Sequence, residues 1–198
     1  SIDTDNHLLI LKIDENFVGT VAESPFPDNQ RIWDVLVEAD AVQFLTDRGV
    51  ETFADDALSL AAMNLRSPEA GLQGLNLMRT SDGLYWLSSF DDTLMIGATI
   101  EGDRVDILRG DPRFQPVLAM EEGPNNQLIV GAQGLVVTHD LITKQDRILL
   151  EWDEEGQTPQ FLPMALLHHN DALYIGTYDT GLLRYTERDG EVYRYEMG

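Results

Sequence analysis

The chain has 198 residues, of which 43% are apolar and 24% charged, a balance typical of a soluble globular protein with a sizeable buried core. Its formal net charge of −22 repels phosphate backbones and anionic lipid headgroups, so nucleic acid and membrane surfaces are disfavoured as partners. The sequence contains no cysteine, which excludes disulfides and thiolate metal sites, and its first 20 residues lack a signal-peptide pattern.

Short β-type segments follow one another along most of the chain. Residues 7–22 predict a hairpin, with a turn at residues 14–16 between two β-rich runs. From residue 31 onward, apolar runs alternate with turns that contain Gly, Asp or Asn. The expected strands are 32–37, 40–46, 50–53, 75–78, 83–89, 93–99, 104–108, 117–120, 127–132, 134–138, 147–152 and 161–167, followed by three strands between 171 and 195.

Residues 55–74 interrupt this β pattern. Asp55 or Asp56 can cap a helix that would end before Pro68 and Gly71. Its apolar residues recur at helical spacing, at Leu58, Ala61, Ala62 and Leu65. We expect either one short helix here or an outermost strand of irregular sequence.

The β segments repeat with a period of 42 to 45 residues. The second strand of each unit is expected to begin after Asp40, Asp82, Asn126 or Asp171. Residues 82–86 align with 171–175, and residues 128–136 align with 173–177 and 181–183. A β-only period of this length, with four strands in each period, is typical of β-propeller blades. We therefore predict an all-β fold of four-stranded antiparallel blades.

The predicted blades cover residues 31–66, 74–109, 116–152 and 161–196, and residues 7–22 form half a blade. Residues 1–198 thus form a single partial β-propeller of about four and a half blades, which we expect to belong to a larger ring. Blade surface exposed at both ends would favour homodimers.

Four aromatic residues are interpreted as core or inter-blade packing, with stacking on a sugar ring as the alternative: Trp33, Phe44, Trp86 and Tyr174.

The sequence contains no nucleophile elbow, phosphate-binding glycine loop or His-Glu-x-x-His motif. Adjacent His168 and His169 point to opposite faces of a strand, so we expect no shared metal. Asp3 and Asp5 lack the rest of a calcium loop. Four carboxylate pairs could indicate a glycosidase, but all fall in expected turns or strand ends, where we interpret them as solvated: Asp55–Asp56, Asp91–Asp92, Glu121–Glu122 and Glu154–Glu155.

Polar residues before and between the strands could face an axial opening or a rim of loops. The candidate ligand contacts are Arg79, Asp82, Asn125, Asn126, His169, Asn170 and Asp179. No metal or cofactor is expected. Gly176 and Gly181 are interpreted as positions where the backbone bends or packs closely.

The last unit resembles the regulator-propeller repeats of periplasmic sensor regions in bacterial hybrid two-component kinases and some diguanylate cyclases. It reads Leu-Tyr-Ile-Gly-Thr at 173–177, Gly-Leu-Leu-Arg-Tyr at 181–185 and Tyr-Arg-Tyr at 193–195. Residues 128–135 are a looser match, and residues 82–99 have Leu87 and Thr93 where the repeat has glycine. The Gly-His and Trp-Asp pairs of WD repeats are absent in register.

This resemblance implies a periplasmic or cell-envelope sensor propeller that binds a small molecule, a glycan or a protein and is not itself catalytic. Its kinase or cyclase output domain would lie outside this chain. Two alternatives remain open, because a fold does not determine a function. They are a carbohydrate-active propeller enzyme and an acidic scaffold for protein–protein interaction.

Overall fold

The structure is a computed structural model that describes residues 10–14, 17–22, 31–39, 41–46, 49–54, 57–60, 74–89, 94–98, 105–109, 116–152, 161–178 and 180–195. Every regular element in these ranges is a β-strand. Within them there is consequently no helix of the length and apolarity that a membrane span requires.

The strands form one hairpin and four four-stranded sheets, in which consecutive strands pair antiparallel. We name the four-stranded sheets blades I to IV. The hairpin consists of β1 (Ile10–Asp14) and β2 (Phe17–Ala22). Blade I contains β3 (Ile32–Val37), β4 (Val42–Thr46), β5 (Gly49–Ala54) and β6 (Ala57–Leu60). Blade II contains β7 (Gly74–Arg79), β8 (Tyr85–Ser89), β9 (Leu94–Ala98) and β10 (Val105–Arg109).

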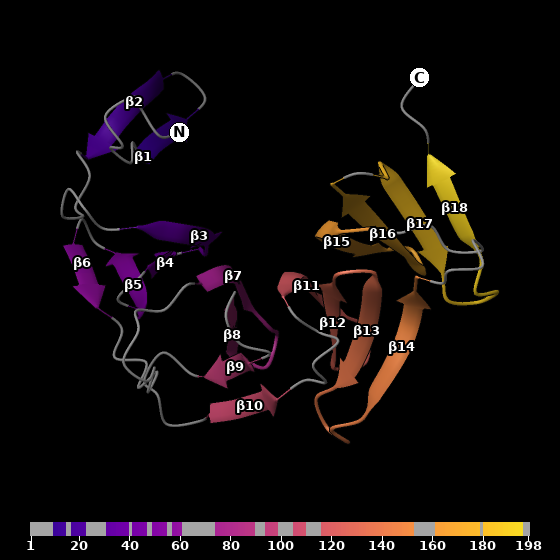
Figure 1. The fold of residues 1–198 in the computed structure, drawn as a ribbon. Helices are drawn as coiled ribbons and strands as arrows, with labels where there is room; N and C mark the ends of the chain where they lie inside the picture. The colour runs from indigo at the N-terminus through magenta and orange to yellow at the C-terminus, as the bar shows by residue number, and fades with distance from the viewer. Residues whose placement is uncertain are drawn as a thin grey trace.

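Blade III contains β11 (Val117–Gly123), β12 (Gln127–Ala132), β13 (Leu135–Asp140) and β14 (Asp146–Glu151). Blade IV contains β15 (Pro163–His169), β16 (Ala172–Thr177), β17 (Leu182–Thr186) and β18 (Val192–Tyr195). Figure 1 shows the four blades around a common centre, with the first strand of each innermost and the fourth outermost. The ring is open between the β1–β2 hairpin and blade IV (Figure 1). This arrangement confirms the predicted propeller class.

Each blade has an irregularity at the same place in its first strand. The register with the second strand shifts between Ile32 and Asp34, Gly74 and Asn76, Val117 and Ala119, and Pro163 and Ala165. A β-bulge increases the local twist of a strand, here at the innermost position of every sheet. Because the bulge recurs, the blades can be superimposed. Counted from the bulge, Val37, Arg79, Glu122 and His168 hold equivalent places in the first strands, and their partners are Val42, Tyr85, Leu128 and Leu173.

This register corrects the predicted alignment of residues 82–86 with 171–175. That alignment matched Leu84 with Leu173, whereas the equivalent of Leu173 is Tyr85. Successive side chains of a strand point to opposite faces, so an error of one residue exchanges the two faces. Tyr85 in fact packs toward blade I, and Leu84 packs toward blade III.

The core lies between blades, because each sheet has two apolar faces that only its neighbours can cover. One apolar cluster fills each contact between consecutive blades, which we call a junction. Phe44 and Trp86 are fully buried and Trp33 packs into the I/II junction, as predicted for packing residues. Tyr174 is only half-buried.

The strand alternative is correct for residues 57–60, where β6 pairs with β5 at the outer edge of blade I. The helix alternative is wrong for these four residues, and residues 55–56 and 61–73 lie outside the described ranges.

Gly181 has a φ of 85° and, as predicted, lies in a backbone bend. The prediction is wrong for Gly176, where an added Cβ would make an ordinary contact of 3.5 Å. The close approach occurs at the equivalent Gly131, where an added Cβ would lie 2.9 Å from Cγ of Pro163.

Candidate functional site

The connections between the first and second strands of the blades lie at one end of the ring, which we call the rim. All the candidate ligand contacts except Asp179 lie on the rim or on the residues that flank it. Arg79 and His169 end the first strands of blades II and IV. Asp82, Asn125, Asn126 and Asn170 lie in the turns that follow first strands. Asp179 lies outside the described residues.

Backbone conformation accounts for the residue types in two of these turns. Asn125 and Asn126 both have φ of 58°, and Asn170 and Asp171 have φ of 49° and 58°. Asn and Asp tolerate this left-handed region better than other non-glycine residues. The two-residue turn at 170–171 connects antiparallel strands with both φ values positive, as a type I′ hairpin turn requires. These side chains are nevertheless exposed, so they remain accessible to a ligand.

At the rim, each blade makes a polar contact with the next blade at an equivalent position. Nη1 of Arg79 donates to Oε1 of Glu38 in blade I over 2.6 Å. The carboxylate of Glu122 accepts the backbone N–H of Ser81 in blade II over 2.8 Å and its hydroxyl over 2.6 Å. The backbone N–H of His168 donates to Oε1 of Glu121 in blade III over 3.3 Å. Blades II, III and IV thus contact the preceding blade through Arg79, Glu122 and His168, and we call this place at the end of the first strand the receiving position.

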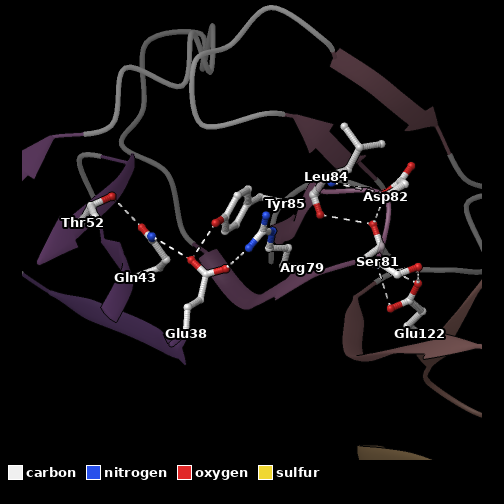
Figure 2. Close-up of polar contacts among 10 residues, drawn as sticks. Glu38, Gln43, Thr52, Arg79, Ser81, Asp82, Leu84, Tyr85 and Glu122 are labelled. Carbon is white, nitrogen blue, oxygen red and sulfur yellow. Dashed lines mark hydrogen bonds and ion pairs between the residues drawn. The ribbon is translucent and has the colours of Figure 1, made fainter. Parts of the chain in front are cut away.

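The Glu38 carboxylate is the centre of the most connected part of the rim. Its Oε2 accepts the Tyr85 hydroxyl over 2.6 Å and Nε2 of Gln43 over 3.0 Å, and Gln43 in turn accepts the Thr52 hydroxyl over 2.6 Å. The Arg79 guanidinium lies 5.4 Å from the centre of the Tyr85 ring, within cation–π range. Figure 2 shows these side chains converging on Glu38 from blades I and II.

The electrostatics of this network favour a fixed connection over proton transfer. Burial acts to raise the pKa of Glu38, but hydrogen bonds from Tyr85, Gln43 and Arg79 outweigh it and hold the pKa below its ordinary value. Burial and the bond to Glu38 raise the pKa of Tyr85. Both shifts move these groups away from neutrality, where an acid–base catalyst works best.

Asp82 stabilises the β7–β8 loop. Its Oδ1 accepts the Thr80 hydroxyl over 2.6 Å and the backbone N–H of Leu84 over 3.3 Å. Thr80 also accepts Nε1 of the buried Trp86 over 3.2 Å. Arg79 and Asp82 are therefore both engaged in contacts that shape the rim (Figure 2).

The interpretation of Glu121 and Glu122 as simply solvated is wrong. Each is partly buried and contacts a different neighbouring blade, because adjacent residues of a strand point to opposite faces. Burial raises the pKa of Glu121, against the opposing bond from His168. Opposed carboxylates cannot flank one glycosidic bond as a glycosidase pair does. The other three carboxylate pairs lie outside the described residues.

His168 is half-buried and His169 exposed, and Nε2 of His169 lies 2.7 Å from the Asn170 amide nitrogen. In the part of the chain that the structure describes, no three His, Asp or Glu side chains are grouped to hold a metal ion. Asp3 and Asp5 lie outside this part.

Sequence reasoning missed Glu38, Tyr85 and Ser81, and it named Glu122 only as a member of a solvated carboxylate pair. The available signal was their spacing, since the Glu38–Arg79 and Ser81–Glu122 contacts each join residues 41 apart, close to one repeat. A search for polar partners one period apart would have found both pairs.

No family model matches the sequence, and no curated protein is similar to it. Solved structures do share its fold. The extracellular domain of the hybrid two-component system BT4673 from B. thetaiotaomicron superimposes with a TM-score of 0.68 at 12% identity, over 97% of this chain and 26% of that one. The corresponding domain of BT3049 gives 0.62 at 13% identity, over 83% and 24%.

Virginiamycin B lyase from Staphylococcus aureus gives a TM-score of 0.72 at 14% identity, over 98% of this chain and 68% of the lyase chain. The chain thus spans about a quarter of the length of the sensor domains and about two thirds of the lyase. These similarities agree with the regulator-propeller resemblance and show the fold, which sensors and an enzyme share.

Proposed function

We propose that this chain is a segment of an extracytoplasmic sensor propeller from a bacterial signalling protein, which recognises a ligand at its rim and is not itself catalytic. The observation that supports this proposal is the similarity of almost the whole chain to the extracellular domain of a hybrid two-component system. In this proposal, signal output belongs to a kinase or cyclase domain outside the chain.

The proposed ligand contacts are the exposed rim side chains of blades III and IV. Asn125, Asn126, His169 and Asn170 present amide and imidazole groups that both donate and accept hydrogen bonds. Arg79 and Asp82 take a supporting role, because their side chains hold the rim loops in place. The net charge of −22 disfavours an anionic ligand, so a neutral glycan or another uncharged polar molecule fits this surface best.

Calorimetry of the complete polypeptide with a panel of neutral oligosaccharides tests the proposal. Asn126→Gly and Asn170→Gly remove the amides but keep the left-handed backbone, because glycine adopts it without strain. Each variant, and His169→Ala, should weaken binding of a ligand found in the panel about tenfold, the equivalent of one lost hydrogen bond. Gln133→Ala, in the exposed turn between β12 and β13, is the matched control and should bind normally. If all three variants bound the ligand with the affinity of the original protein, the ligand would not bind at this site.

The similarity to virginiamycin B lyase supports a second candidate, a propeller enzyme, and we propose carbohydrate as the substrate class to test for it. Incubating the same panel with the complete polypeptide and following products by mass spectrometry separates the two. Binding without turnover supports the sensor. If the polypeptide converted a member of the panel, and a rim carboxylate substitution such as Asp82→Asn abolished this turnover, the enzyme proposal would be correct and the sensor proposal wrong.

A further inference from the structure

One face of blade IV carries large apolar side chains exposed to solvent. Residues that pair across strands lie on the same face, and Leu167, Tyr174, Arg184 and Tyr193 form one such row. Leu182 and Tyr195 form a second pair on this face, because each lies two residues from a member of that row. We call this surface the open face. Leu167, Leu182, Tyr193 and Tyr195 are 56%, 39%, 45% and 48% exposed.

The equivalent residues of blade III form the III/IV junction. Ile129, Val136 and Leu150 of blade III correspond to Tyr174, Leu182 and Tyr195, because they hold the same places in the strand register. They are 0%, 0% and 6% exposed, and they pack against Leu173, Ile175 and Leu183 of blade IV. The open face therefore has the composition of a junction surface, but no described residue covers it.

We propose that the open face of blade IV is the docking surface for one further four-stranded blade of the same ring, carried by the same polypeptide. The surface continues the three junctions already present, each of which buries this face of one blade against the next. It also borders the gap in the ring (Figure 1). About a third of the virginiamycin B lyase chain, which has this fold, lies outside the part that this chain covers.

A second copy of the chain is a poorer occupant. Two chains that each carry a net charge of −22 repel one another, whereas a covalently connected blade arrives at high effective concentration. The existing junctions also describe the incoming blade. Blades II and IV each present two alternate apolar residues of the second strand toward the preceding blade, Tyr85 and Leu87 or Leu173 and Ile175. We expect the docking blade to carry the same pattern.

The rim of blade IV would take part in this docking. Glu38 and Ser81, which follow the first strands of blades I and II, each bind the receiving position of the next blade. His169 and Asn170 occupy the corresponding place in blade IV. The docking blade should therefore place the end of its first strand beside these two residues, and a ligand bound by His169 and Asn170 would lie at the boundary between the two blades.

Tyrosine acetylation followed by mass spectrometry tests the proposal, with residues 1–198 compared against the complete natural polypeptide. Tyr178, 79% exposed on the β16–β17 turn, is the accessible reference, and Tyr185, 8% exposed, is the buried one. Tyr195 should react like Tyr178 in the segment and fall to the rate of Tyr185 in the complete polypeptide. Reaction at the rate of Tyr178 in both would overturn the proposal.

The substitution Leu182→Asp tests the proposal in a second way, because it places a charge on the open face. Ile142→Asp, on the exposed β13–β14 turn, is the matched control. In the complete polypeptide, Leu182→Asp should restore the reactivity of Tyr195 and lower the melting temperature, whereas Ile142→Asp should change neither. If Tyr195 were protected from acetylation only at concentrations where the complete polypeptide associates, and not in the diluted monomer, a second copy would cover the open face. That result would overturn the proposal.

Discussion

The I/II and III/IV junctions have the same geometry and different chemistry. Both contain an apolar cluster between the facing blades. At I/II, charged groups complete the contact, because Glu38 binds Arg79 and Asp34 accepts the backbone N–H of Leu77 over 2.7 Å. At III/IV, Gly131 packs closely on Pro163, and the backbone N–H of Gly134 donates to the Phe161 carbonyl over 2.9 Å. The ion pair across III/IV, between Arg147 and Glu187, is longer, at 3.4 Å, and more exposed.

The difference shows what a propeller repeat specifies. Each junction must exclude water from two sheet faces and give most of its buried polar groups a partner, but many residue types satisfy both demands. The consequence is that stability should depend more on pH and salt at the I/II junction, and more on side-chain volume at the III/IV junction.

Ile129→Ala should have the largest effect. Ile129 is fully buried in the III/IV cluster, and truncation of such a side chain costs about 2–5 kcal/mol of unfolding free energy, with little dependence on salt. Urea unfolding at low and high salt measures this. The control is Ile142→Ala on the exposed β13–β14 turn, expected to cost less than about 0.5 kcal/mol. Equal losses for both variants would mean that the cluster does not hold the blades together.

Gly131→Ala should cost about 1–3 kcal/mol, because the added methyl group overlaps the Pro163 ring and the blades must separate to admit it. Gly176 holds the equivalent position in blade IV, and its added Cβ would lie 3.5 Å from the Cβ of Ala165. Gly176→Ala should therefore preserve stability. Thermal unfolding of the two variants tests the comparison, and a loss at Gly176 as large as that at Gly131 would contradict it.

Glu38→Gln should cost about 1–2 kcal/mol at neutral pH, since it removes the charge from the hydrogen bonds with Arg79 and Tyr85. The pKa of Glu38 in the folded protein lies below its ordinary value of 4.5. Its contribution is therefore present above pH 4.5 and lost as the pH falls through the folded pKa. Unfolding measured across this range should show the variant and the original converging in acid; parallel curves would exclude a role for the Glu38 charge.

Glu121→Gln should have the smallest effect and the opposite sign. Burial raises the pKa of Glu121 above its ordinary value of 4.5, so its contribution is present below pH 4.5 and lost as the pH rises through the folded pKa. A neutral amide can still accept the His168 N–H without this penalty, and we expect a gain of about 0.5 kcal/mol at neutral pH. The same unfolding series measures it. Destabilisation like that of Glu38→Gln would show that both junctions depend on charge.

Much of the fold followed from local signals. Turn residues such as Asn170 and Gly181 separate the strands, and the repeat of about one blade identifies the architecture. The candidate site was predicted only in outline. The chosen rim residues do come from adjacent turns, but the Glu38 network was not foreseen, because its partners belong to different repeats and no local pattern connects them.

The sequence by itself determined that this chain folds into repeated four-stranded antiparallel units, because strand periodicity and turn chemistry act over a few residues. Only the tertiary structure decided which face of each strand meets which neighbour. The chain takes six positions from Arg79 to its partner Tyr85 but five from His168 to its partner Leu173. This difference of one residue changes the faces presented by Leu84 and Tyr85, and packing against the adjacent blades selects between them.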